Sequence, residues 1–151
     1  MASSSSSMLA AVPSLGYPVT EKLTRNNHAL WKAQVLSALK GAQVAHFLSS
    51  ATTVPPKTVA KTPEKPDDKI PNPDYDVWVA KDQQILNYLL SSLSRDILAQ
   101  VAALPTATAV WESIEGMFAS QSRVRVINTR MALEGLLLHR GILHQDEVPG
   151  R

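Results

Sequence analysis

Histidine is the residue type in this chain best suited to proton transfer or metal binding near neutral pH. A metal site on a helix needs a second ligand three or four residues from the first, on the same face. No two histidines have that spacing, and the sequence contains no cysteine. We therefore predict no metal site, and we interpret the four histidines as solvated or locally hydrogen-bonded side chains: His28, His46, His139 and His144.

Two pairs of carboxylates could form an acid–base site, because positioned acids are common agents of proton transfer. Asp67 and Asp68, and likewise Asp74 and Asp76, stand close to prolines, where a solvated turn is the favoured interpretation. The sequence also lacks a glycine-rich phosphate loop and a Gly-x-Ser-x-Gly elbow. We therefore predict no catalytic residue, no cofactor-binding residue and no small-molecule substrate, and we do not expect an enzyme.

Arg123, Arg125 and Arg130 form the one basic cluster that could bind a ligand. Arg123 and Arg130 are seven residues apart and would share a helix face, whereas Arg125 would point elsewhere. Such a cluster can contact a polyanion such as RNA, or it can be the solvated face of a helix. The formal net charge is only +2, which makes no strong case for nucleic acid. Both interpretations stay open.

Length and composition indicate one domain between two irregular ends. The chain has 151 residues, enough to bury a real core. A serine run lies within residues 1–18, which we predict to be a disordered tail; a transit peptide is the alternative. The N-terminus has no basic segment followed by an apolar one, and no apolar run approaches the ~18 residues that cross a bilayer. We therefore expect a cytoplasmic protein with no membrane partner.

Residues 49–73 differ from the rest of the chain in composition, since six of the ten prolines lie there. Proline fixes φ and removes a backbone donor, so neither a helix nor a central strand survives this density. We predict a long exposed loop inside the domain. The Pro55-Pro56 pair could serve as a polyproline ligand, but a plain linker is favoured because no convincing PxxP core surrounds it.

Residues 74–93 are predicted to form the longest helix, around which the others pack. Trp78, Ile85 and Leu89 lie near one line at helical spacing, and three further leucines form a second line beside it. The combined apolar stripe is wider than that of a typical surface helix, so we expect it to contact more than one neighbour. Burying one such side chain is worth roughly 1.5–3 kcal/mol.

Four further amphipathic segments accompany this helix, within residues 24–41, 95–104, 106–118 and 120–138. Gly41 is the expected C-cap of the first, and Thr106 is the expected N-cap of the third. Strand signals are poor, since there is no sustained alternation and no Asn-Gly or Asp-Gly turn. We predict an all-α fold, a compact bundle of about five helices over residues 19–138, followed by an irregular tail over residues 139–151.

The three tryptophans, Trp31, Trp78 and Trp111, each lie on the apolar stripe of a predicted helix. An aromatic ligand box is the alternative, but core packing is favoured for aromatic residues at helical spacing. We therefore expect the three segments that carry them to pack against each other. The apolar triplet 136–138 has no obvious partner within the chain, which motivates self-association because such surface tends to find a partner.

Several short motifs follow one another along the chain, within residues 22–31, 72–78, 82–86, 89–94, 106–111 and 118–123. In this order they resemble the Gag polyprotein of plant Ty1/copia-type LTR retrotransposons, in its N-terminal, capsid-like part. The resemblance runs from about residue 19 to residue 133. It implies a helical capsid-like domain, and its motif core falls on five side chains: Trp31, Trp78, Leu89, Trp111 and Phe118.

The resemblance implies a structural role, since protease, integrase and reverse transcriptase lie further along such polyproteins. It implies self-association into homo-oligomers and particles around the element RNA. The family often continues into a CCHC zinc knuckle, which a chain without cysteine lacks, so the RNA contact is expected to be weak. We expect a truncated remnant of a transposable element that acts by self-association; an RNA-binding fragment with a weak basic patch is the alternative.

Overall fold

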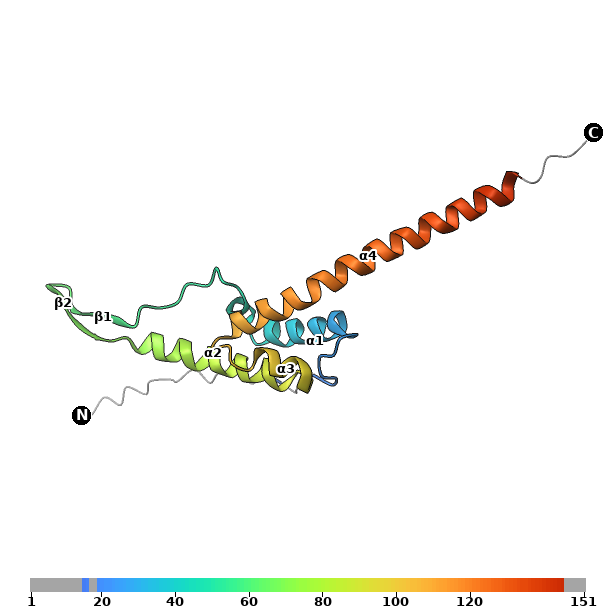
Figure 1. Ribbon diagram of the computed structural model, residues 1–151. Helices are drawn as coiled ribbons and strands as arrows, with labels where there is room; N and C mark the ends of the chain where they lie inside the picture. Colours follow the sequence, from blue (N-terminus) through green and yellow to red (C-terminus); the bar gives the residue numbers. More distant parts are fainter. Residues whose placement is uncertain (1–14, 17–18, 146–151) are drawn as a thin grey trace, which may run out of the picture. The chain divides into compact units, whose positions relative to one another are not determined.

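The computed structural model describes residues 15–16 and 19–145, with the backbone alone over residues 142–145. Most of these residues are helical, and the sheet among them has two strands (Figure 1). The elements are α1 (His28–Gly41), the 3-10 helix η1 (Ala45–Leu48), β1 (Thr58–Thr62), β2 (Lys65–Pro71), α2 (Pro73–Ser91), α3 (Arg95–Val101) and α4 (Ala107–Gln145). The tail predicted over residues 1–18 lies outside the described residues, apart from residues 15–16.

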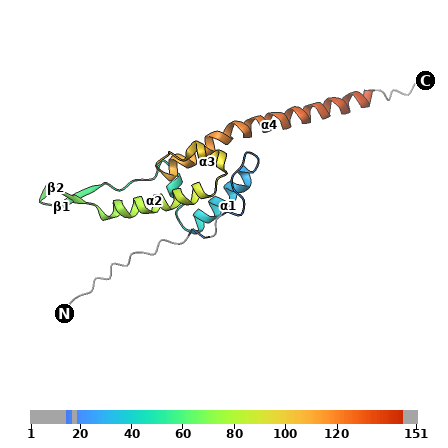
Figure 2. The same ribbon diagram turned by 60° about the horizontal axis from the view of Figure 1, so that its bottom comes forward.

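The chain divides into two compact units, residues 1–113 and residues 114–151. Apolar side chains of α1, η1, α2, α3 and the first residues of α4 form the core of the first unit. Figures 1 and 2 both place the β-hairpin at the N-terminal end of α2, away from α1 and α3. The described part of the second unit is the remainder of α4.

The helix α1 buries one regular stripe. Trp31, Val35 and Leu39 recur every four residues, and each is at most 1% exposed. This spacing places the three side chains on one face of a 3.6-residue helix. Asn27 precedes α1, but its side chain bonds back to the preceding loop, since Nδ2 donates to the carbonyl of Lys22 at 2.9 Å. The asparagine thus fixes the entry to the helix without capping it.

The end of α1 differs slightly from the prediction. The helix includes Gly41, and the backbone amide of Ala42 still donates to the carbonyl of Ala38 at 3.0 Å. The residue with a left-handed conformation is Gln43, with φ of 60°. The predicted glycine cap at Gly41 is therefore wrong in position, because the chain leaves the helix two residues later.

The long helix predicted at residues 74–93 is confirmed as α2. Asn72 caps it, since its Oδ1 accepts a hydrogen bond from the backbone amide of Asp74 at 3.1 Å. Pro73 occupies the first helical position, where its missing N–H costs nothing. Ile85 and Leu89 are at most 1% exposed, so the predicted stripe does face the core.

The segment predicted as a loop over residues 49–73 contains an antiparallel hairpin of β1 and β2. Val59 pairs with Ile70 and Ala60 with Lys69. The prediction of no strand is therefore wrong here, because proline excludes a central strand but tolerates the ends and edges of a two-stranded ribbon. The predicted exposure is largely confirmed, since all of β2 is exposed and one residue of β1 is half-buried.

A short parallel bridge ties the segment before α1 to the end of α2. Leu23 and Leu93 form it, and both are at most 1% exposed. The amide of Leu23 donates to the carbonyl of Ser92 at 2.8 Å, and the amide of Ser94 donates to the carbonyl of Leu23 at 3.0 Å. The bridge satisfies these backbone groups beside the core and leads directly into α3.

The two helices predicted over 106–118 and 120–138 form one continuous helix, α4, which also extends beyond Leu138 to Gln145 (Figure 2). The irregular tail predicted over residues 139–151 is therefore wrong over residues 139–145, and its remainder lies outside the described residues. The predicted break is wrong because the one residue between the two segments is Ala119, the best helix former, and no proline lies near it. The predicted N-cap is confirmed, since Thr106 Oγ1 accepts from the amide of Ala109 at 3.2 Å.

The fold is therefore mostly helical, with a small two-stranded sheet, and all-α describes it only approximately. Four α-helices and one 3-10 helix are present among the described residues. The predicted bundle of five helices is not confirmed, because two predicted helices are continuous and the hairpin was not foreseen.

Candidate functional site

Two of the predicted motif tryptophans meet in the core of the first unit. The rings of Trp31 and Trp111 stack with their centroids 5.7 Å apart and their planes at 26°. The Trp31 Nε1–H donates to Ser92 Oγ at 3.0 Å, and Ser92 Oγ in turn donates to the carbonyl of Leu89 at 2.6 Å. Ser92 is 1% exposed, and the two hydrogen bonds give both its hydroxyl and the Trp31 Nε1–H a partner. These bonds fix the orientation of the Trp31 ring.

The third tryptophan, Trp78, contacts a different aromatic residue. Its ring stacks on Phe47 of η1, with centroids 5.4 Å apart. Trp78 is half-buried, whereas the motif residues Leu89 and Phe118 are buried. The sequence correctly placed Trp31 and Trp111 together, but Trp78 belongs to a separate aromatic contact.

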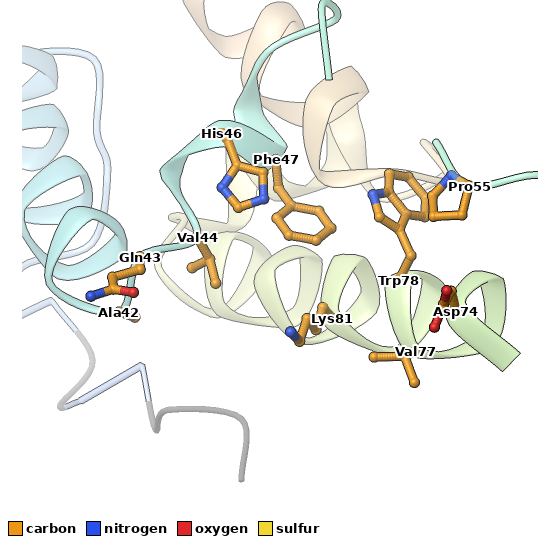
Figure 3. A pocket seen from close by; sticks show the side chains of 10 residues that line it. All are labelled: Ala42, Gln43, Val44, His46, Phe47, Pro55, Asp74, Val77, Trp78 and Lys81. Carbon is orange, nitrogen blue, oxygen red and sulfur yellow. The ribbon is translucent and has the colours of Figure 1, made fainter. Parts of the chain in front are cut away.

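Trp78 lines an open pocket of about 390 Å³ between η1 and the first turns of α2 (Figure 3). Val44 and Phe47 form one side, and Asp74 and Lys81 project from α2 with Trp78 between them along the helix. The Trp78 Nε1 is buried and has no hydrogen-bond partner. A buried donor without an acceptor costs about 1–3 kcal/mol. The pocket can hold an apolar group, but its aromatic contact also serves the packing of η1 on α2.

Asp82 is a buried carboxylate that the sequence analysis did not single out. It is 2% exposed, and its Oδ1 accepts from the amide of Ala107 at 3.1 Å. Its Oδ2 accepts from Gln83 Nε2 at 3.2 Å. Negative charge is favourable at the N-terminal end of a helix, so Asp82 stabilises the start of α4. A signal was available, because Asp82 interrupts the apolar stripe between Trp78 and Ile85.

The carboxylates considered for acid–base chemistry are exposed. Asp67 and Asp68 lie in β2, and Asp74 and Asp76 lie in the first turn of α2. Lys61 Nζ lies 3.9 Å from Asp68 Oδ2, in a solvent-exposed ion pair of the hairpin. The structure separates the two pairs into different elements.

The histidines are also distributed over separate elements. His28 begins α1, His46 lies in η1, and His139 lies in α4; the side chain of His144 lies outside the described residues. Among the side chains that are described, no group of three or more histidine, cysteine, aspartate or glutamate residues could hold a metal ion.

Burial raises the pKa of Tyr88 above its ordinary value of 10.0.

The predicted basic cluster lies on α4, within the second unit. Arg123, Arg125 and Arg130 are all exposed. Helical spacing puts Arg123 and Arg130 on one side and Arg125 on another, as expected. Arg125 and Arg130 border a shallow depression whose remaining walls are Ser122, Val126, Thr129 and Leu133. The arginines thus lie beside apolar side chains of the same helix.

Among the side chains described on this part of α4, which end at Gly141, eight large apolar ones are exposed, each by 55–70% of its surface. They are Val124, Val126, Ile127, Met131, Leu133, Leu136, Leu137 and Leu138. Large contiguous apolar areas are rare on monomeric proteins and commonly mark contact sites. The triplet 136–138, expected to have no partner within the chain, is exposed on every residue.

These features define a mostly helical protein with one packed unit and a second unit whose helix exposes apolar side chains. No helix in the described part of the chain is long and apolar enough to span a membrane. The family described as gag-polypeptide of LTR copia-type matches residues 29–137. Since the match covers most of the chain, the protein belongs to the copia-type gag family, which confirms the resemblance predicted from the motifs.

Two similar proteins come from Arabidopsis thaliana. The chain is 32% identical over 115 residues to the Retrovirus-related Pol polyprotein from transposon RE1, covering 75% of this chain and 7% of that protein. It is 32% identical over 132 residues to the corresponding polyprotein from transposon RE2, covering 84% of this chain and 9% of that protein. The chain therefore spans less than a tenth of the length of either relative. No solved structure matches it.

Proposed function

We propose that this chain is a non-enzymatic assembly module of a copia-type retrotransposon and acts by self-association in the cytoplasm. The observation that carries the proposal is the set of eight apolar side chains exposed on the described part of α4. Membership of the gag family supports a structural role. The arrangement of side chains in the first unit supports it too, because its buried polar groups serve packing and helix capping.

The physical reason for association is the removal of apolar surface from water. Each square ångström of apolar surface buried contributes about 25 cal/mol, and the exposed leucines of α4 gain this only in contact with a partner. Association costs translational and rotational freedom, so the contact must involve several of these side chains together. Several such side chains follow one another along α4, which meets that requirement.

The test is the mass of the purified chain as a function of concentration, by sedimentation velocity and light scattering. We expect the mean mass to rise with concentration. A variant with Ile127→Asp and Leu133→Asp should lose this rise, since both side chains are exposed on α4. Leu30→Asp is the matched control, because Leu30 is 53% exposed on α1 and its replacement should leave association unchanged. A chain that stays monomeric at high concentration would refute the proposal.

RNA binding is a second candidate, favoured by the charges of α4. Between residues 114 and 141 the helix carries four arginines against two glutamates: Arg123, Arg125, Arg130 and Arg140 against Glu115 and Glu134. Contacts to phosphates release counterions, so affinity should fall steeply with salt. Titration of a single-stranded RNA at several salt concentrations tests this. Loss of affinity in Arg123→Gln/Arg130→Gln supports the candidate, and binding that ignores salt or is absent excludes it.

A further inference from the structure

The eight exposed apolar side chains that the structure describes on α4 are divided between two faces of the helix. Face one comprises Val124, Ile127, Met131 and Leu138. Face two comprises Val126, Leu133, Leu136 and Leu137. At 100° per residue, the mean directions of the two faces are about 150° apart. They are therefore nearly opposite sides of one helix.

Polar or small residues separate the two faces. Arg123, Arg130 and Glu134 lie between them on one side of the helix. On the other side lie the polar residues Arg125, Asn128 and His139 and the small residues Ala132 and Gly135. A helix that packs on one side normally buries an apolar stripe a little over 100° wide on its own surface. One partner helix cannot cover two stripes whose centres are about 150° apart.

Each face is large enough for a partner of its own. Four side chains with roughly 100 Å² exposed apiece give about 400 Å², close to the apolar share of one side of a standard interface. The two faces together would then engage two neighbours.

We propose that α4 contacts two further copies of this chain at once, one through each face, so that α4 helices form a continuing row. This inference rests on the proposed self-association and specifies its geometry. A closed three-helix bundle would need the two contact directions about 60° apart, whereas directions near 150° belong to a layer or a wide ring.

Charge favours a second copy that runs antiparallel. In an antiparallel pair related by a two-fold axis, flanking residues on the same side of both helices meet each other. With the crossing point near residue 132, Arg130 of one copy lies opposite Glu134 of the next, and the reverse pair forms as well. Residue 132 is also close to the middle of face one, which extends from Val124 to Leu138. Apolar and charged contacts therefore agree on one register.

The test compares the full chain with three variants at equal concentration by sedimentation velocity, after circular dichroism has shown equal helicity. Ile127→Asp/Met131→Asp removes face one, Leu133→Asp/Leu137→Asp removes face two, and the third variant carries all four changes. We expect the unchanged chain to grow beyond a dimer, each single-face variant to stop at a dimer, and the third variant to be monomeric.

The outcomes separate this inference from the proposed function. An unchanged chain that is monomeric refutes both. Three outcomes refute only the two-face arrangement. In the first, the unchanged chain stops at a dimer. In the second, a single-face variant grows as large as the unchanged chain, and in the third, a single-face variant is monomeric, because the two faces would then act as one interface.

A charge exchange tests whether the partner is a second, antiparallel copy. Glu134→Arg alone should weaken association roughly tenfold, because it turns two attractive contacts into repulsive ones. Arg130→Glu alone should do the same. The variant with both changes should recover the original association, since the reciprocal pairs form again with exchanged signs. Failure of the double exchange to recover association contradicts the antiparallel register.

Discussion

The two units of this chain differ in which side chains they bury: the first buries polar groups in its core, and the second leaves large apolar side chains exposed. In the first unit, Ser92 and Asp82 are buried polar residues, and each has a hydrogen-bond partner: Ser92 accepts from Trp31, and Asp82 accepts from the amide of Ala107. In the second, leucines such as Leu136 and Leu137 are 64–66% exposed on a single helix. Buried polar groups with partners specify a unique packing, whereas exposed apolar groups become favourable only when another surface covers them. The comparison assigns stability to the first unit and association to the second.

The largest expected effect on stability is at Trp31, and it tests whether the first unit alone holds the fold together. Trp31→Ala removes a fully buried ring that stacks on Trp111, and should cost about 3–5 kcal/mol of unfolding free energy. Leu136→Ala removes a large apolar side chain of the second unit and should change unfolding by less than about 0.5 kcal/mol in dilute protein. Urea denaturation followed by circular dichroism measures both. Equal costs at the two positions would contradict the division of roles.

A smaller effect is expected at the carboxylate that caps α4. Asp82→Ala removes the acceptor for the amide of Ala107 and should cost about 1–2 kcal/mol. Asp82→Asn is the matched control, because its side-chain oxygen can still accept that hydrogen bond, and it should cost less. Thermal denaturation at one protein concentration checks both variants. If the two are equally destabilised, the carboxylate charge rather than the hydrogen bond is the stabilising feature.

The smallest expected effect is a pH dependence of the unfolding free energy, caused by the buried phenol of Tyr88. Burial raises the pKa of Tyr88 above 10.0 in the folded chain, while the unfolded chain keeps the ordinary value. Below pH 10 both states hold the proton, and stability is unaffected. Above it the unfolded state loses the proton first, so stability falls as pH rises, by at most about 1.4 kcal/mol per pH unit.

Tyr88→Phe isolates this contribution, because it removes the phenol and keeps the ring. Unfolding free energies of both proteins between pH 9 and pH 11 give the two slopes. We expect the original chain to lose stability more steeply than the variant over this range. Parallel slopes would show that the phenol titrates alike in both states.

Sequence patterns located most of the helical structure because amphipathic spacing is a local property. The stripe of Ile85 and Leu89, the N-cap at Thr106 and the exposure of the triplet 136–138 were all predicted and are confirmed. The family was predicted from ordered motifs and is confirmed as well. The contacts assigned to Arg123, Arg125 and Arg130 stay predictions, as do the domain limits and the truncated state of the element.

The hairpin of β1 and β2 was missed although its strands are neighbours in the sequence, because the residues between them carry no Asn-Gly or Asp-Gly turn signal and the strands form only by pairing. Two other features were missed because they depend on partners distant in the sequence. The role of Asp82 could not be assigned, since its partner Ala107 lies 25 residues away. Trp78 was expected beside Trp31 and Trp111 but stacks on Phe47, because η1 brings another aromatic ring to α2.

The sequence by itself determined where most of the helical residues lie, which stripes of α1 and α2 are apolar, and which family the motifs belong to, because these depend on neighbours within a few turns. Only the tertiary structure decided which apolar stripes are covered. The stripe of Trp31, Val35 and Leu39 is buried, and the two faces of α4 are not, although both consist of similar residues. Burial depends on which helices meet in space, and periodicity along one helix cannot specify that.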